Sequence, residues 1–134
     1  MSAALALQSA LIVALRADAT LTALLGAEAV YDGAPQGAGF PHVALAELAS
    51  LDYGDSAGER QEHYATLLVW SRAGGRRQAL EIIGAITAAL DGAPLTLAGH
   101  GLVNLAVERT EARREADGRT WRGLMRLRAV TEAE

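Results

Sequence analysis

The segment from residue 30 to residue 43 limits the fold more than any other part of the chain. It reads VYDGAPQGAGFPHV, which predicts a short strand at Val30–Asp32, a turn over Gly33–Gly39 and a second strand that begins after Pro41. Proline is accepted at the first position of a strand because no ladder hydrogen bond is missed there. The segment holds no catalytic motif, so we interpret its glycines and prolines as shaping the backbone.

Hydrophobic periodicity predicts the other elements. A repeat of about 3.6 residues predicts helices over residues 3–16, 20–25 and 76–90. Alternation predicts strands over residues 42–52, 63–71, 102–110 and 120–130. The order is α-α-β-β-β-α-β-β, and strands joined by hairpins favour antiparallel pairing. The predicted fold class is α+β, with an antiparallel sheet of four to five strands and two main helices packed on one face.

The strand over residues 63–71 has apolar side chains on both faces. The side expected to face the core holds Ala65, Leu67 and Val69. The other side holds three larger residues, Tyr64, Leu68 and Trp70. Because a contiguous apolar surface is rarely left in solvent, we expect a partner to cover this second side.

The last strand separates its side chains by charge. One side carries Trp121, Met125, Leu127 and Ala129, and the other carries Arg122, Arg126 and Arg128. The arginine stripe is either a solvated sheet face, with Glu108 as a possible partner, or a protein interface. It has no interleaved aromatic residues, which argues against nucleic-acid binding.

Two strands alternate less clearly. In the strand over residues 102–110, the side chains predicted to point inward are Val103, Leu105 and Val107. In the strand over residues 42–52, Val43 and Leu45 are predicted to point to one side of the sheet. Ala44, Ala46 and Leu48 are predicted to point to the other side.

The composition excludes several kinds of site. The chain has no cysteine, which excludes disulfides, thiolate zinc sites, iron–sulfur clusters and cysteine nucleophiles. All twelve basic residues are arginine, and the net charge is −4. A net negative charge disfavours binding of nucleic acid. The apolar segment over residues 1–15 lacks a basic start and is too short for a span. We therefore expect neither a signal peptide nor a membrane segment.

No set of residues has the pattern of a catalytic or cofactor site. His42 and His63 could form a metal pair, but no carboxylate spacing supports it, and His100 lies in a distant loop. Four acids without a shared spacing are interpreted as solvated charge: Glu47, Asp52, Glu59 and Glu62. Ser71 lacks the G-x-S-x-G pattern, and the Gly74-Gly75 pair lacks the lysine of a phosphate loop. We expect no enzyme activity and no cofactor.

Four segments, taken in order, carry a family resemblance: VYDGAPQGAGFPHV (30–43), LLVWSR (67–72), GLVNLAVE (101–108) and RREADGRTWRGLMRLRAVTE (113–132). Together they resemble the tail-completion, or tail-terminator, proteins of long-tailed phages, prophages and gene transfer agents. The chain is most similar to the gene-transfer-agent branch. No single motif is diagnostic, and the collinear set carries the resemblance.

The resemblance implies one structural domain over residues 1–134 without enzyme activity, cofactor or membrane contact. It implies a homohexameric ring that caps the head-proximal end of the tail tube, stops tube polymerisation and joins the tail to the head. The implied partners are further copies of the chain, the tail tube protein and the head–tail connector or stopper. DNA would pass through the channel without specific binding. The implied location is the tail neck of a virion or phage-like particle assembled in the bacterial cytoplasm.

Ten residues are candidates for a subunit or tube interface. They belong to the second side of the strand over 63–71, to the arginine stripe and to two polar loops, over residues 53–62 and 113–119, that are expected to be mobile before assembly. The candidates are Tyr64, Leu68, Trp70, Arg122, Arg126, Arg128, Asp55, Glu59, Arg60 and Arg114. A closed ring needs two different complementary patches on each subunit, and we expect the aromatic side and the arginine stripe to supply them. A sheet edge could also extend across the subunit boundary.

Two alternatives remain open. One is another stopper or connector protein of the same neck. The other is an unrelated enzyme or small-ligand binder, since a fold does not fix a function. A discrete hexamer in solution would favour the ring, whereas a monomer or dimer would favour an enzyme.

Overall fold

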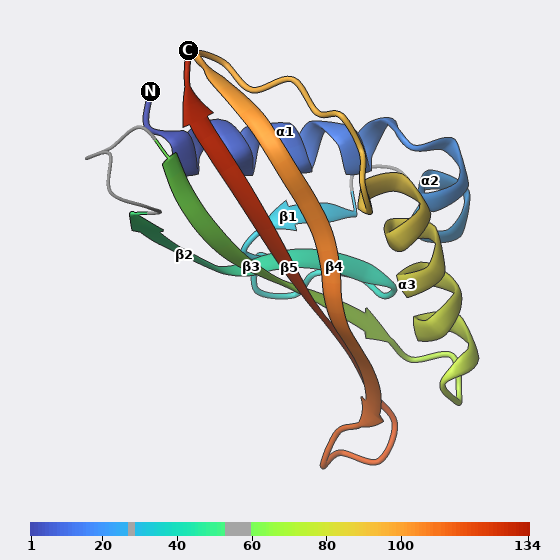
Figure 1. Ribbon diagram of the computed structural model, residues 1–134. Coiled ribbons are helices and arrows are strands. Elements are labelled where there is room, and N and C mark those ends of the chain that lie inside the picture. Colours follow the sequence, from blue (N-terminus) through green and yellow to red (C-terminus); the bar gives the residue numbers. More distant parts are fainter. Residues whose placement is uncertain (27–28, 53–59) are drawn as a thin grey trace.

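The computed structural model describes residues 1–26, 29–52 and 60–134 (Figure 1). Its elements are α1 (Ala3–Ala17), α2 (Ala19–Leu25), β1 (Val30–Asp32), β2 (His42–Asp52), β3 (Arg60–Ser71), α3 (Arg77–Leu90), β4 (His100–Arg114) and β5 (Trp121–Ala133). The predicted order of elements and the α+β class are confirmed. The strands β3, β4 and β5 are longer than predicted, and β4 and β5 form a hairpin that projects beyond the helices (Figure 1).

The five strands form one mixed sheet in the order β1-β2-β3-β5-β4. All neighbours are antiparallel except β1 and β2, which run parallel, so the prediction of a purely antiparallel sheet was wrong. Residues 33–41 carry the chain back to the start of β1 before β2 begins. The pair is closed by Val43 N, which donates to Ala29 O, and by Gly33 N, which donates to Leu45 O.

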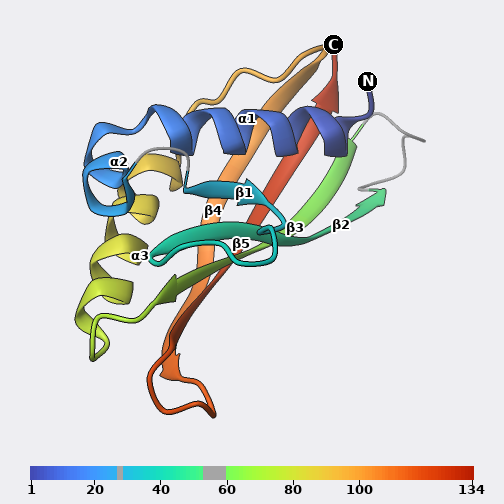
Figure 2. The same cartoon turned by 180° about the vertical axis from the view of Figure 1, so that it is seen from behind.

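Side-chain caps begin the first two helices. The Ser2 hydroxyl accepts a hydrogen bond from Leu5 N at 3.1 Å, and Asp18 accepts one from Leu21 N at 2.9 Å. Gly26, with a φ of 86°, ends α2. Figures 1 and 2 show α1 lying across one face of the sheet, with α3 packed beside it.

The core lies between these helices and the sheet. The largest apolar side chains in it come from the three helices and the central strands, and none is more than 1% exposed: Leu7, Leu11, Leu15, Leu21, Ile82, Ile86, Leu90, Leu67, Met125 and Leu127. The predicted core sides of β3 and β5 are confirmed, because Ala65, Leu67 and Val69 are buried and lie in register with the buried side of β5.

β-bulges overturn two of the predicted orientations. Ala46 is an extra residue between the pairs made by Leu45 and Glu47, so Leu48 pairs with Ala65 and packs against the core instead of facing away. On β4 the register shifts at Val103, which is 45% exposed rather than inward. Simple alternation fails at both places because one inserted residue reverses the side of everything that follows.

Candidate interaction surface

The face of the sheet opposite the helices gathers most of the predicted interface residues. Register pairs Trp70 with Arg122, Thr66 with Arg126, and Tyr64 with Arg128. The predicted aromatic side and the predicted arginine stripe are therefore one surface. They cannot serve as the two separate patches that a ring contact needs.

The arginines of this open face are bonded within the chain. Arg128 Nε donates to Glu62 at 2.6 Å, and hydrogen bonding to Glu62 raises the pKa of Arg128. Arg126 lies 4.0 Å from Glu108, the partner considered from the sequence, and its guanidinium sits 4.5 Å above the Tyr64 ring.

Arg122 is paired in a different way. Its Nε lies 3.2 Å from Glu115, but this buried atom makes no aligned hydrogen bond, so the contact is an ion pair only. Arg60 also has a partner, since its guanidinium lies 3.3 Å from Glu132. Because these charges are already paired within the chain, electrostatic attraction would contribute little to binding of a partner at this face. Its half-buried aromatic and leucine side chains remain the surface available for contact.

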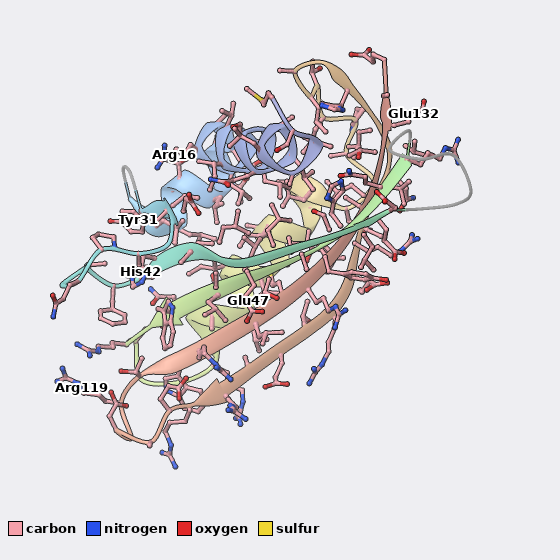
Figure 3. All side chains as sticks on the ribbon, turned by 90° about the vertical axis from the view of Figure 1, so that its left-hand side faces the viewer. Arg16, Tyr31, His42, Glu47, Arg119 and Glu132 are labelled. Atoms are coloured by element: carbon pink, nitrogen blue, oxygen red, sulfur yellow. The ribbon has the colours of Figure 1, made fainter. Side chains whose placement is uncertain are left out.

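The segment over residues 30–43 ends in an aromatic cluster. His42 is buried, and its Nδ1 lies 2.7 Å from Gly39 O. Its ring centroid lies 5.8 Å from that of Tyr31 (Figure 3) and 6.5 Å from that of Trp70. Phe40 stands beside it under the guanidinium of Arg72, at 4.1 Å. The cluster fastens the loop after β1 to the end of β3.

His63 joins three strands from inside the sheet. It is fully buried, its Nδ1 lies 2.6 Å from the Ser50 hydroxyl on β2, and its Nε2 lies 2.9 Å from the Thr131 hydroxyl on β5. Burial lowers the pKa of His63 below its ordinary value of 6.5, and the charge of His100 lowers it further. Sequence reasoning missed this role because its partners lie on other strands. Within the described residues, no three His, Asp or Glu side chains gather as metal ligands.

Stability is expected to fall in mild acid because of His63. The folded state keeps this imidazole neutral below pH 6.5, where the unfolded chain takes up a proton. The stabilisation is complete above that pH and is lost as the pH falls from 6.5 through the lower folded pKa. Thermal unfolding followed between about pH 7 and about pH 5 should show a smaller decrease for His63→Gln than for the wild type. Equal decreases in the two proteins would contradict this role.

The two predicted loops differ from expectation in extent. Asp55 and Glu59 lie outside the described residues, whereas Arg60 already belongs to β3. The second loop is a short turn between Arg114 and Trp121, closed by a hydrogen bond from Glu115 N to Thr120 O at 2.7 Å.

Asp117 organises this turn. Its carboxylate accepts hydrogen bonds from the backbone N–H groups of Arg119 and Thr120 and from the Thr120 hydroxyl. These bonds, led by that of the Thr120 side chain, lower the pKa of Asp117 to about 2. The end of the hairpin is therefore preformed, and Gly118, with a φ of 76°, takes the position that requires a left-handed backbone.

Both edges of the sheet are partly covered. Arg16 donates to Val30 O on the outer side of β1 at 2.7 Å. On β4, Leu105 O accepts from Gly92 N, and Val107 N donates to Asp91, both at 2.8 Å. These bonds occupy main-chain groups that an added strand would need, so the middle of β4 is closed to sheet extension. The length of β2 beyond Leu45 has no β1 partner.

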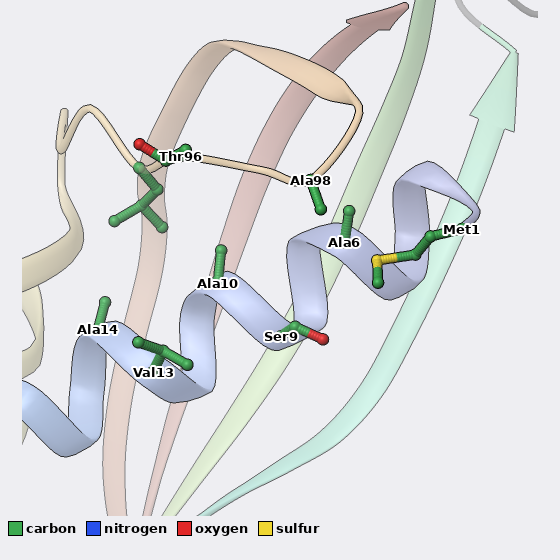
Figure 4. A pocket seen from close by; sticks show the side chains of 9 residues that line it. Met1, Ala6, Ser9, Ala10, Val13, Ala14, Thr96 and Ala98 are labelled. Atoms are coloured by element: carbon green, nitrogen blue, oxygen red, sulfur yellow. The ribbon is translucent and has the colours of Figure 1, made fainter.

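A shallow apolar hollow lies between α1 and the segment before β4. Ala6, Ala10 and Val13 line it on the helix side, and Ala98 lines it on the other (Figure 4). Among the described residues that line it, two have polar side chains, Ser9 and Thr96. Within the described parts of the chain, no single helix is long and apolar enough to cross a membrane. Taken together, α1 and α2 are long and apolar enough by length and composition alone, but the pair is bent by 75°.

Comparison with known proteins identifies the family. Residues 9–132 match the family model of tail completion protein gp17. The chain belongs to this tail completion family. Its fold matches a protein in the virion of a native gene transfer agent particle, with a TM-score of 0.88 and 36% identity over 99% of this chain and 100% of that one.

A second solved structure is similar to this chain in fold only. The gp17 protein of bacteriophage SPP1 matches with a TM-score of 0.64 and 22% identity, over 95% of this chain and 89% of that one. No curated protein sequence is significantly similar to the chain. The tail completion family, predicted from four collinear segments, is thus confirmed by an independent comparison of sequence and of structure.

Proposed function

We propose that this tail completion protein is a structural component of the neck of a virion or gene transfer agent particle, without enzyme activity. It forms a homohexameric ring that caps the head-proximal end of the tail tube, stops tube polymerisation and joins the tail to the head connector. The observation that carries the proposal is the full-length match, at 36% identity, to a protein of a gene transfer agent virion. The number six comes from the resemblance to tail-terminator proteins.

The described surface supports a role in assembly rather than catalysis. The open face of the sheet has paired charges around half-buried Tyr64, Leu68 and Trp70, a composition suited to protein contact. The net charge of −4 suits a channel that lets DNA pass without holding it. The partners in this proposal are further copies of the chain, the tail tube protein and the connector, in a particle assembled in the cytoplasm.

Disrupting the gene in a particle-producing host is expected to give tails of irregular and excessive length. The reason is that nothing would halt addition of tube subunits. Electron microscopy of negatively stained particles gives the length distribution, and expression of the wild-type chain in trans should restore it. Tails of normal length that are separated from heads would instead favour a stopper or connector role. Intact particles with normal tails would refute both roles.

A further inference from the structure

Five of the twelve arginines have no carboxylate within 4.0 Å among the described residues. Seven others lie within 4.0 Å of one: Arg60, Arg77, Arg109, Arg113, Arg122, Arg126 and Arg128. Arg16 donates a hydrogen bond to a main-chain carbonyl of β1. The remaining four are Arg72, Arg76, Arg114 and Arg119.

These four arginines lie at one end of the molecule, where two of them, Arg76 and Arg114, contact the ring of Trp121. The guanidinium of Arg76 lies 4.9 Å from the centre of the Trp121 ring, and that of Arg114 lies 5.9 Å from it. Arg72 Nε donates to the hydroxyl of Thr120, the residue next to Trp121, at 3.1 Å. Figure 3 shows Arg119 at this end, with Glu132 at the other. We call Arg72, Arg76, Arg114 and Arg119 the arginine cluster.

The arrangement suits recognition of an anion. A guanidinium held against an aromatic ring keeps its N–H edge directed outward and loses less freedom when it binds. The same edge can form two parallel hydrogen bonds with a carboxylate. All four side chains are exposed, and Trp121, which lies against Arg76 and Arg114, is half-buried. Tryptophan and arginine are also the residue types that most often dominate the energy of a protein interface.

Charge distribution favours a protein carboxylate over a nucleic-acid phosphate. Residues 108–128 contain seven arginines and four acidic residues, whereas the rest of the chain contains five arginines and twelve acidic residues. A polyanion such as DNA would be repelled by this acidic body. A second copy of the chain would present the acidic body to the arginine cluster instead.

The second copy also offers two unpaired carboxylates on one edge strand, one on each face of the sheet. Glu47 and Asp52 are exposed and have no hydrogen bond or ion pair in the described structure. They lie on the part of β2, Ala46–Asp52, that has no β1 beside it. Leu51, which is 56% exposed, lies on the same face as Glu47. We call this part the free length of β2.

We propose that the arginine cluster of one copy docks on the free length of β2 of a second copy, with the arginines meeting Glu47 and Asp52. This inference rests on the proposed ring, and it supplies the two different patches that a head-to-tail contact requires. Such a contact is made by side chains, because Arg76 Nε and Asp91 already occupy main-chain groups of β4.

Charge reversal tests the contact. In sedimentation velocity at low salt, the wild type should self-associate, and the double variant Arg76→Glu, Arg114→Glu should associate at least about tenfold more weakly because like charges then meet. Glu47→Arg, Asp52→Arg should weaken association similarly. Combining all four changes should restore it, and added salt should weaken the wild-type complex. Circular dichroism checks that each variant folds.

A matched control separates the cluster from general charge. Arg77→Glu, Arg109→Glu makes the same change in net charge at two arginines that already have partners, Glu81 and Glu111, and should leave association near the wild-type level. The inference is overturned if the cluster variant associates as the wild type does, if the four changes together restore nothing, or if the wild type stays monomeric. Binding of a labelled DNA duplex that depends on Arg76 and Arg114, with association unaltered, would also overturn it. None of these results alters the tail-length test, which decides the proposed function separately.

Discussion

Replacing Leu67 by alanine is expected to lower the free energy of unfolding by about 2–5 kcal/mol. Leu67 has no exposed surface, and it lies on the central strand β3 between Leu45 of β2 and Met125 of β5. Alanine would lose the transfer free energy of the removed carbons and leave a cavity that rigid neighbours cannot fill. Urea unfolding followed by circular dichroism, at concentrations where the chain is monomeric, measures the loss.

The next residue provides the control. Leu68 is on the same strand but on the open face, half-buried opposite Leu124. Leu68→Ala removes the same atoms from a site in contact with solvent, so its effect on the monomer should be clearly smaller. Equal losses at the two positions would mean that both faces of β3 are buried in the monomer, contrary to the fold described above.

Gly123→Ala is expected to cost about 1–3 kcal/mol, although it adds only one carbon. Gly123 lies on β5 opposite Val69, under α3. A Cβ at this position would lie 2.9 Å from Ile83 Cδ1 and 3.0 Å from Val69 Cβ. The end of the Ile83 side chain can turn aside, but Val69 Cβ is fixed to the backbone of β3, so β3 and β5 must shift slightly apart. Thermal and urea unfolding both report the effect.

Gly101 is the matched glycine for this test. It also lies in a strand, and its added Cβ would meet Glu132 Cγ at 3.4 Å, an ordinary contact with a side chain at the surface. Gly101→Ala should therefore be nearly neutral or slightly stabilising, because alanine restricts the unfolded chain. A Gly123→Ala protein as stable as Gly101→Ala would show that β3 and β5 accommodate the added carbon beside Val69 without cost.

Features that depend on neighbours in sequence were predictable. The caps Ser2 and Asp18, the buried stripe of α3 and the opposite sides of β3 and β5 follow from patterns of a few residues. The parallel pairing of β1 with β2 was not predictable in this way. Both a hairpin and a returning loop satisfy the sequence over residues 33–41, and only contacts with the rest of the sheet decide between them.

The candidate site was predictable as a set of residues but not as an arrangement. The arginine stripe and the aromatic side appear in the sequence, yet only strand order shows that they form one face. The pairing of Arg128 with Glu62 and the gathering of Arg76 and Arg114 around Trp121 join residues far apart in the chain. No local pattern indicates which arginines find a carboxylate. The inferred contact between copies depends on this difference between paired and unpaired arginines.

The bulge at Ala46 has a consequence for how β2 can change in evolution. Loss of Ala46 itself would remove the bulge and keep every later pair, so Leu48 would stay in the core and Ser50 would stay beside His63. Loss of one residue from a regular part of the strand would instead exchange inside and outside for the residues beyond it. Among related chains, single-residue insertions and deletions in this strand should therefore fall at the bulge, or be matched by gain or loss of a bulge elsewhere along it.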